Sequence, residues 1–151
     1  WSAISGVVDK SRLGSAAVAV GVARGAISQA LGYSSQRIAF RRSIDRFGSI
    51  RAMLAESATA IEGARLMLWR AASLFDSGKP ASREAAMANL AAKQAAYQTT
   101  RNAVQILGGN GYSREYPVER AYRDVQSSAP FGGGEDLQKI LVSRSLTGAQ
   151  S

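Results

Sequence analysis

Apolar residues recur along the first half of the chain at the spacing of amphipathic helices. The first segment, over about residues 11–40, and the second, over about residues 50–75, each carry a stripe spaced alternately three and four residues apart. The stripe positions are Leu13, Ala16, Val20, Ala23, Ile27 and Ala30 in the first segment, and Ile50, Leu54, Ser57, Ile61, Ala64, Leu68, Ala71 and Phe75 in the second. Such a seven-residue repeat over several turns is typical of helices that pack side by side in a bundle.

The second half of the chain predicts one more long helix and two shorter segments. Gly78 and Pro80 end the second helix, and Ser82 is the expected N-cap of the third, which ends at Gly108. One face of this third helix carries Met87, Leu90, Gln94, Tyr97, Arg101 and Val104. Its polar members face a ligand, a partner subunit or the rim of the core. A short segment follows over residues 118–125, and a last helix begins at Glu135, where the helix dipole favours acids.

These elements predict the fold class. No stretch alternates polar and apolar residues for long enough to form a strand, so we expect no sheet. At 151 residues the chain is long enough for one domain with a buried core. The pattern therefore predicts a single all-α domain over residues 1–151, folded as an antiparallel four-helix bundle.

Composition excludes several classes of protein. The chain has no cysteine and no histidine, which removes disulfides, thiolate metal sites, and the commonest general base and metal ligand. Glu115, Glu119 and Asp124 lack the spacing of metal ligands, so no metal site is predicted. No membrane-length apolar run and no secretory leader are visible, so we expect no membrane contact and a cytoplasmic location. Because the chain begins with Trp1, we expect it to be an excised part of a longer protein.

Positive charge favours anionic partners. Nineteen Lys and Arg against eleven Asp and Glu give a net charge of +8. The densest cluster is Arg37, Arg41, Arg42, Arg46 and Arg51. Nucleic acid, an acidic surface or the phosphates of a cofactor or substrate would suit it, and a solvated basic helix end is the alternative. Gly132-Gly133-Gly134 before a helix is either a phosphate cradle or a loop with an N-cap.

Several motifs, in order along nearly the whole chain, resemble those of the acyl-CoA dehydrogenase family. The hallmark stretch is Gln105-Ile-Leu-Gly-Gly-Asn-Gly-Tyr112, followed by Tyr116-Pro-Val-Glu-Arg120 and Arg123-Asp124. Before it lie Asp9-Lys-Ser-Arg12, Arg37-Ile-Ala-Phe40, Met53-Leu-Ala-Glu56 and Ala64-Arg65, and after it Phe131-Gly-Gly-Gly-Glu-Asp-Leu-Gln138. The resemblance implies the four-helix C-terminal domain of a flavoenzyme whose N-terminal helical and middle β domains lie outside this chain.

The resemblance also implies an activity and site residues. Such enzymes oxidise acyl-CoA thioesters: a carboxylate removes the α-proton while a β-hydride passes to FAD. By their match to family positions, Arg37, Phe40, Gln105, Gly108 and Gly109 are expected to contact the FAD of a neighbouring subunit. Asp9 and Arg12 match residues that line the acyl-CoA site. A guanidinium can fork onto a diphosphate, and glycines let the backbone approach a ligand closely.

Departures from the family pattern concern the chemistry. The family's catalytic glutamate corresponds to Gly132, which cannot accept a proton, so no catalytic residue is assigned. Ser11 stands where some members supply the base from the first helix, and Glu135 and Asp136 lie just past the missing one. Arg41 and Gly134 replace a family glycine and threonine, and Gly48 replaces a glutamine.

Three readings therefore stay open. The favoured one is a domain of an acyl-CoA-dehydrogenase-type flavoprotein that makes oligomer contacts and completes a neighbour's FAD site, with any base supplied from elsewhere. The second is a non-catalytic subunit paired with an active homologue. The third, nucleic-acid binding through the arginine cluster, ranks last because neither a groove-reading motif nor an aromatic stacking platform accompanies the charge.

Overall fold

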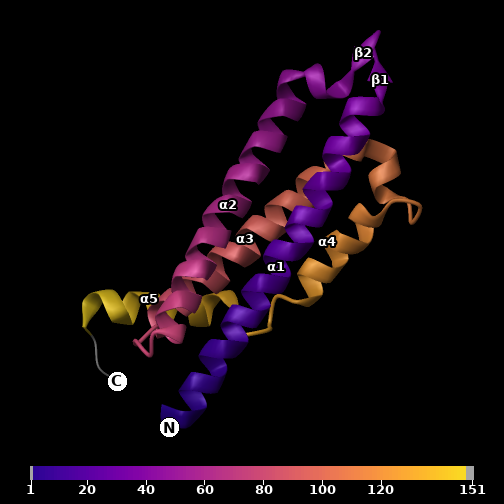
Figure 1. The fold of residues 1–151 in the computed structure, drawn as a ribbon. Helices are drawn as coiled ribbons and strands as arrows, with labels where there is room; N and C mark the ends of the chain where they lie inside the picture. Colours follow the sequence, from indigo (N-terminus) through magenta and orange to yellow (C-terminus); the bar gives the residue numbers. More distant parts are fainter. Residues whose placement is uncertain (1, 149–151) are drawn as a thin grey trace.

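The computed structural model describes residues 2–148, and nearly all of them are helical (Figure 1). The α-helices are α1 (Ser2–Gln36), α2 (Gly48–Asp76), α3 (Ser82–Leu107), α4 (Pro117–Ser127) and α5 (Glu135–Thr147). Between them lie the strands β1 (Ile38–Ala39) and β2 (Arg42–Ser43) and the 3₁₀ turns η1 (Ile44–Arg46) and η2 (Gly108–Tyr112). Trp1, on which the expectation of an excised fragment rests, lies outside the described residues.

Helix α3 organises the arrangement. It packs against α1 and α2 along their length and also contacts α4 and α5. Figure 1 shows α1, α2, α3 and α4 running along one axis, each reversing the direction of the one before, with α5 lying across the end that carries the N-terminus. The all-α class and the bundle are confirmed. Among the described residues the helices number five rather than the predicted four.

The seam between α1 and α3 is built from alanine. Ala16, Ala23, Ala92 and Ala96 are fully buried in one cluster, with Val20 and Ile61 of α2 beside them. Small side chains let the two helix backbones approach closely, and alanine also has the highest helix propensity. The stripes predicted for α1 and α2 are confirmed, since every member is buried or partly buried.

The stripe described on α3 lies mostly on the exposed side of the helix. Met87, Tyr97 and the polar Gln94 and Arg101 are exposed, whereas the alanines on the opposite side are covered. A central helix that touches two long neighbours buries its small residues, so its large apolar residues do not mark the core. On α5, likewise, the buried residue is Gln138, and Leu137 and Ile140 are exposed.

The connection from α1 to α2 also differs from the prediction. Helix α1 ends at Gln36, and residues 38–43 form a two-stranded antiparallel hairpin, so the expectation of no sheet was wrong. The two turn residues, Phe40 and Arg41, have φ angles of 50° and 65°. This left-handed conformation costs a non-glycine residue about 1–2 kcal/mol. A two-residue turn needs it to reverse the chain this tightly.

The start of α3 differs from the prediction. The N-cap of α3 is Ala81 rather than Ser82, and its side chain makes no capping bond. The hydroxyl of Ser82 instead donates to Asp9 on α1. Among residues 2–148, no helix combines the length and the apolar composition needed to cross a bilayer.

The alanine seam gives the first testable prediction. Ala23→Leu should destabilise the chain by about 1–3 kcal/mol, because the added carbons have no room between α1 and α3. Ala17→Leu, at an exposed position of the same helix, should change stability by less than about 0.5 kcal/mol. Urea unfolding followed by circular dichroism measures both. Equal effects for the two variants would contradict the close packing of this seam.

Candidate functional site

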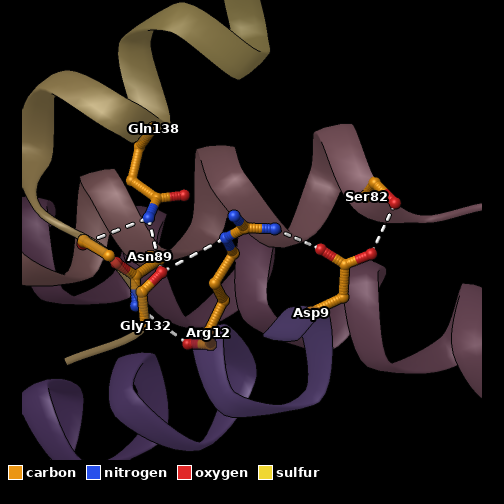
Figure 2. A network of polar contacts seen from close by, with 7 residues as sticks. Asp9, Arg12, Ser82, Asn89, Gly132 and Gln138 are labelled. Carbon is orange, nitrogen blue, oxygen red and sulfur yellow. Dashed lines mark hydrogen bonds and ion pairs between the residues drawn. The ribbon is translucent and has the colours of Figure 1, made fainter. Parts of the chain in front are cut away.

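A buried polar network joins α1, α3, α5 and the loop between α4 and α5 (residues 128–134). Figure 2 shows Asp9 and Arg12 pointing toward each other from successive turns of α1. They form an ion pair, and the second oxygen of the Asp9 carboxylate accepts a bond from Ser82 Oγ. Asp9 is 3% exposed and Arg12 is 6% exposed. Both charges are thus compensated inside the domain, as buried ions must be.

The carbonyl of Gly132 receives two donors from this network (Figure 2). Arg12 Nε lies 3.2 Å from this oxygen, and Gln138 Nε2 lies 2.7 Å from it. Gln138 Nε2 also contacts the Gly133 carbonyl at 3.1 Å, and Asn89 Nδ2 donates to the Arg12 carbonyl at 2.9 Å. The side chains of α1 and α5 therefore fasten the backbone of the loop, and Asn89 of α3 fastens α1 beneath it.

Lys93 on α3 holds the same loop from its other side. Its Nζ donates to the carbonyl oxygens of Ala129, Phe131 and Gly133, at 2.7 Å and 3.2 Å for the first and last. Partial burial lowers the pKa of the Lys93 ammonium. Because the loop has no regular structure, its carbonyls need such donors wherever they turn away from water.

Gly132 has no room for a side chain in this arrangement. Its φ angle is 74°, a conformation that L-residues rarely adopt. A Cβ atom there would lie 3.0 Å from Arg12 Cα and 3.2 Å from Asn89 Nδ2. A glutamate at this position would therefore need the loop to move away from α1, which would break the Arg12 bond as well.

A second candidate site lies at the opposite end of α1, where the hairpin and the η2 turn meet. A cavity of about 310 Å³ is lined there by Tyr33, Arg37, Ile44, Ile106, Leu107, Gly108, Gly109 and Asn110. A Cβ at Gly108 or Gly109 would meet no atom within 4 Å, so both positions open onto free space. Asn110 Nδ2 donates to the Tyr33 hydroxyl at 2.9 Å and ties the turn to α1.

The structure brings together some of the residues predicted for FAD and separates others. Arg37, Gly108 and Gly109 line this one cavity. Phe40 stands at the hairpin tip, 91% exposed, and Gln105 is exposed on the last turn of α3, and neither lines the cavity. The arrangement can bind an anion through Arg37 and leaves the backbone of η2 within reach of the same ligand.

The two candidate sites are far apart. Arg12 lies on α1 and Arg37 directly follows the last residue of that helix, so 25 residues at about 1.5 Å each give a separation of about 37 Å. Arg12 and Asp9 meet the loop at one end, and Arg37 meets the η2 turn at the other. One small ligand cannot touch both sites in one chain.

Sequence reasoning missed the residues that hold the loop. Asn89 and Lys93 lie four residues apart on α3, so they share a face, and neither was predicted to have a role. The signal that could have revealed them is two polar residues of adjacent turns within an alanine-rich helix. Gln138 belongs to the motif that carries the resemblance, but its burial was not foreseen.

Glu135 is one of the carboxylates near the loop that could accept a proton. It is bonded to Lys139 and Gln94, and these bonds lower the pKa of its carboxyl group.

Comparisons with known proteins agree on one family. The profile of the "Acyl-CoA dehydrogenase, C-terminal domain" family matches residues 1–147. The mitochondrial short-chain specific acyl-CoA dehydrogenase of Bos taurus is 43% identical over 139 residues, which are 92% of this chain and 34% of that protein. A cyclohexane-1-carbonyl-CoA dehydrogenase of Geobacter metallireducens is 40% identical over 138 residues, covering 91% and 36%.

The fold is similar to solved structures as well. The butyryl-CoA dehydrogenase of Megasphaera elsdenii superposes with a TM-score of 0.93 at 38% identity, over 95% of this chain and 37% of that one. The chain thus spans about a third of the length of the relatives it matches.

The geometry at Gly132 gives a prediction with an internal control. Gly132→Ala should destabilise the chain by about 1–3 kcal/mol, because its φ is positive and its Cβ would press on Arg12 and Asn89. Gly134→Ala should cost less, about 0.5 kcal/mol, since its φ is −61° and the space around it is open, so that only the weaker N-cap preference of alanine counts against it. Thermal unfolding of both variants measures the difference. A Gly132→Ala protein as stable as Gly134→Ala would show that the loop is not held against α1.

Proposed function

The chain belongs to the acyl-CoA dehydrogenase family as its C-terminal domain, and from this membership we propose that it serves a flavoprotein that oxidises acyl-CoA thioesters with FAD. Two further domains of that protein, one helical and one β, would lie outside this chain, which spans about a third of its relatives. The acyl group would be recognised mostly by those domains. A cytoplasmic location stays a prediction.

The observation that carries the proposal is the cavity at the hairpin end of α1. It gathers Arg37 with Gly108 and Gly109, three of the five residues assigned to FAD by resemblance. When bound, FAD would supply the hydride acceptor. This chain would contribute a guanidinium for the diphosphate and an open glycine turn, and Phe40 and Gln105 would complete the contact from outside the cavity. Because the cofactor would belong to a neighbouring subunit, the role requires an oligomer.

At the other end, Asp9 and Arg12 are proposed to border the acyl-CoA site. Their side chains are buried and bonded to each other, to Ser82 and to Gly132. They would therefore shape the site by holding the loop in place, with little side chain free to bind the thioester directly. This differs from the direct contact that the resemblance suggested.

Three of the candidates for the base at this end, Gly132, Glu135 and Ser11, do not suit the α-proton. In the register of the family, the carboxylate position is Gly132, which has neither the side chain nor the space for one. Glu135 is a weakened base because its bonds to Lys139 and Gln94 lower its pKa. Within the described residues, the Ser11 hydroxyl has no hydrogen-bonded partner that could take its proton. The enzyme reading therefore depends on Asp136 or on a base from the domains that would lie outside this chain.

The steric closure at Gly132 favours the second candidate function, a non-catalytic subunit of a hetero-oligomer. A subunit of this kind would keep the cavity for FAD and the assembly surfaces, and an active homologue would perform the oxidation. In this reading the closed loop would exclude the base without affecting the hairpin, because the two lie at opposite ends of the bundle (Figure 1).

The role of Arg37 can be tested by cofactor affinity in the full-length flavoprotein. Arg37→Ala should weaken FAD binding about 10- to 150-fold, because it removes a charge-assisted contact of about 1.5–3 kcal/mol. Arg24→Ala removes an exposed arginine from the same helix and should leave the affinity unchanged. Flavin fluorescence titration of the apoprotein measures both. Equal affinities for the two variants would place FAD elsewhere.

The two functions predict different flavin chemistry. Mixed anaerobically with saturated acyl-CoAs, the full-length protein alone should reduce its flavin about 10²–10⁴ times more slowly than a relative that has the carboxylate, since no positioned base is present. Addition of an active homologue from the same source should restore turnover if the protein is a paired subunit. Rapid bleaching by the protein alone would instead establish an active enzyme with a base from another domain.

A further inference from the structure

The hairpin tip holds two residues in a conformation that neither prefers. Phe40 and Arg41 are the two turn residues between β1 and β2, and both have positive φ. Two-residue hairpin turns of this kind favour asparagine and glycine. Non-glycine residues persist in such conformations mainly where the surroundings or a function retain them. Arg41 is the residue to explain, because it is exposed and no hydrogen bond or ion pair of the described chain involves its side chain.

The tip is anchored to the second candidate site. The hairpin leaves α1 at Arg37 and returns at Ile44, and both residues line the 310 Å³ cavity. The Ile44 amide donates to the Arg37 carbonyl at 2.9 Å and closes the base of the hairpin. Arg41 therefore stands at the end of a short, closed arm that rises from the rim of the cavity.

Aromatic packing orients the arm and leaves Arg41 apart from it. Phe40 and Phe47 meet edge to face with ring centroids 6.3 Å apart, and the Arg42 guanidinium lies 4.3 Å from the Phe47 ring centre. Phe47 thus receives one neighbour from each side of the turn. Arg42 has a packing role, whereas Arg41 has none.

Positive charge accumulates around the arm without compensation. None of the ion pairs among residues 2–148 involves Arg37, Arg41, Arg42, Arg46 or Arg51. The acid in this segment is Asp45, whose carboxylate accepts a bond from Ser43 Oγ and whose carbonyl accepts one from Arg51. Elsewhere among residues 2–148, Arg12, Arg65, Arg83 and Arg123 are each paired with a carboxylate, while other arginines such as Arg24 and Arg144 also form no ion pair. The arm is therefore distinguished by the close spacing of its unpaired arginines in the sequence.

We propose that Arg41 is an additional anion-binding residue of the cofactor site, which contacts the diphosphate of the neighbouring subunit's FAD beside Arg37. This inference rests on the proposed function. The cavity is at the lower end of the volume range of ligand pockets, so a dinucleotide bound there has to extend beyond it, and the arm with its unpaired arginines rises from the rim at Arg37 and Ile44. A diphosphate is negatively charged and would balance the positive charge of these guanidinium groups. A planar guanidinium is suited to bind it.

This role accounts for an arginine at a position where glycine would fold better. Glycine at residue 41 would relieve the positive φ but would remove a charge from the arm. Arg41 would therefore lower the stability of the apoprotein and raise its affinity for FAD. Two substitutions can separate these effects. Arg41→Gly removes the strain and the charge together, and Arg41→Lys keeps the charge and most of the strain.

The experiment uses the full-length flavoprotein, with FAD as ligand and Arg144→Ala as a control that removes an exposed arginine from α5. Arg41→Gly should raise the melting temperature of the apoprotein by about 1–2 °C and weaken FAD binding about three- to tenfold at low salt. The loss of affinity should shrink at high salt, because exposed charges are screened. Arg41→Lys should keep most of the affinity without the gain in stability.

Each outcome decides the matter. Arg41→Gly protein that is more stable and binds FAD within twofold of the wild type would overturn the role of Arg41, as would an affinity loss equal at low and high salt. If Arg37→Ala weakens binding while both Arg41 variants do not, the FAD site stands and only the further inference fails. If Arg37→Ala and Arg41→Gly both leave the affinity unchanged, the cofactor site itself is wrong.

Discussion

The close approach of α1 and α3 is the constraint on which the rest of the structure depends. Buried alanines on both helices bring the two backbones near each other, and the polar groups at one end of the seam become neighbours for the same reason. Asn89 can donate to the backbone carbonyl of Arg12 only because no large side chain separates the helices. The same proximity places Ser82, at the start of α3, beside Asp9.

The close approach of α1 and α3 also determines the path of the loop after α4. This loop lies over the end of the seam, and its carbonyls are satisfied by one cation from α1, one from α3 and one amide from α5. Each donor depends on a different helix, so the loop can take this path only when the whole bundle is formed. Gly132 packs directly against α1, and a Cβ at this position would lie 3.0 Å from Arg12 Cα. If the proposed family register holds, the lack of a carboxylate at this position is matched by the packing around it.

Sequence patterns could predict the elements and the class because α1 and α2 follow ordinary rules. Their buried stripes contain residues such as Val20 and Ile61, whose apolar character marks the covered face. The same reasoning does not find the buried face of α3. Its buried residues Ala92 and Ala96 are only weakly hydrophobic, whereas the more hydrophobic Met87 and Tyr97 are exposed. The hairpin was missed because two-residue strands are too short for any alternation, and Phe40-Arg41 is not a usual turn sequence. For the candidate site, the resemblance assigned Arg37 and Gly108 to one ligand, and both line one cavity in the structure. No local sequence pattern shows that Lys93 contacts a loop some forty residues further along the chain.

The separation of the two ends of α1 bears on how such a domain could lose its chemistry and remain useful. Arg37 and the η2 turn lie about 37 Å from Arg12, estimated from the helix rise, and share with it no residue of the buried network. A change at Gly132 would disturb Arg12, Asn89 and Gln138, but the cavity at the far end shares no residue with them. The packing of the loop and the geometry of the hairpin can therefore vary independently of each other. On this argument, an arginine-bearing arm at one end of the bundle and a closed loop at the other are compatible with the proposed subunit, whose contribution would be made to a neighbour's flavin.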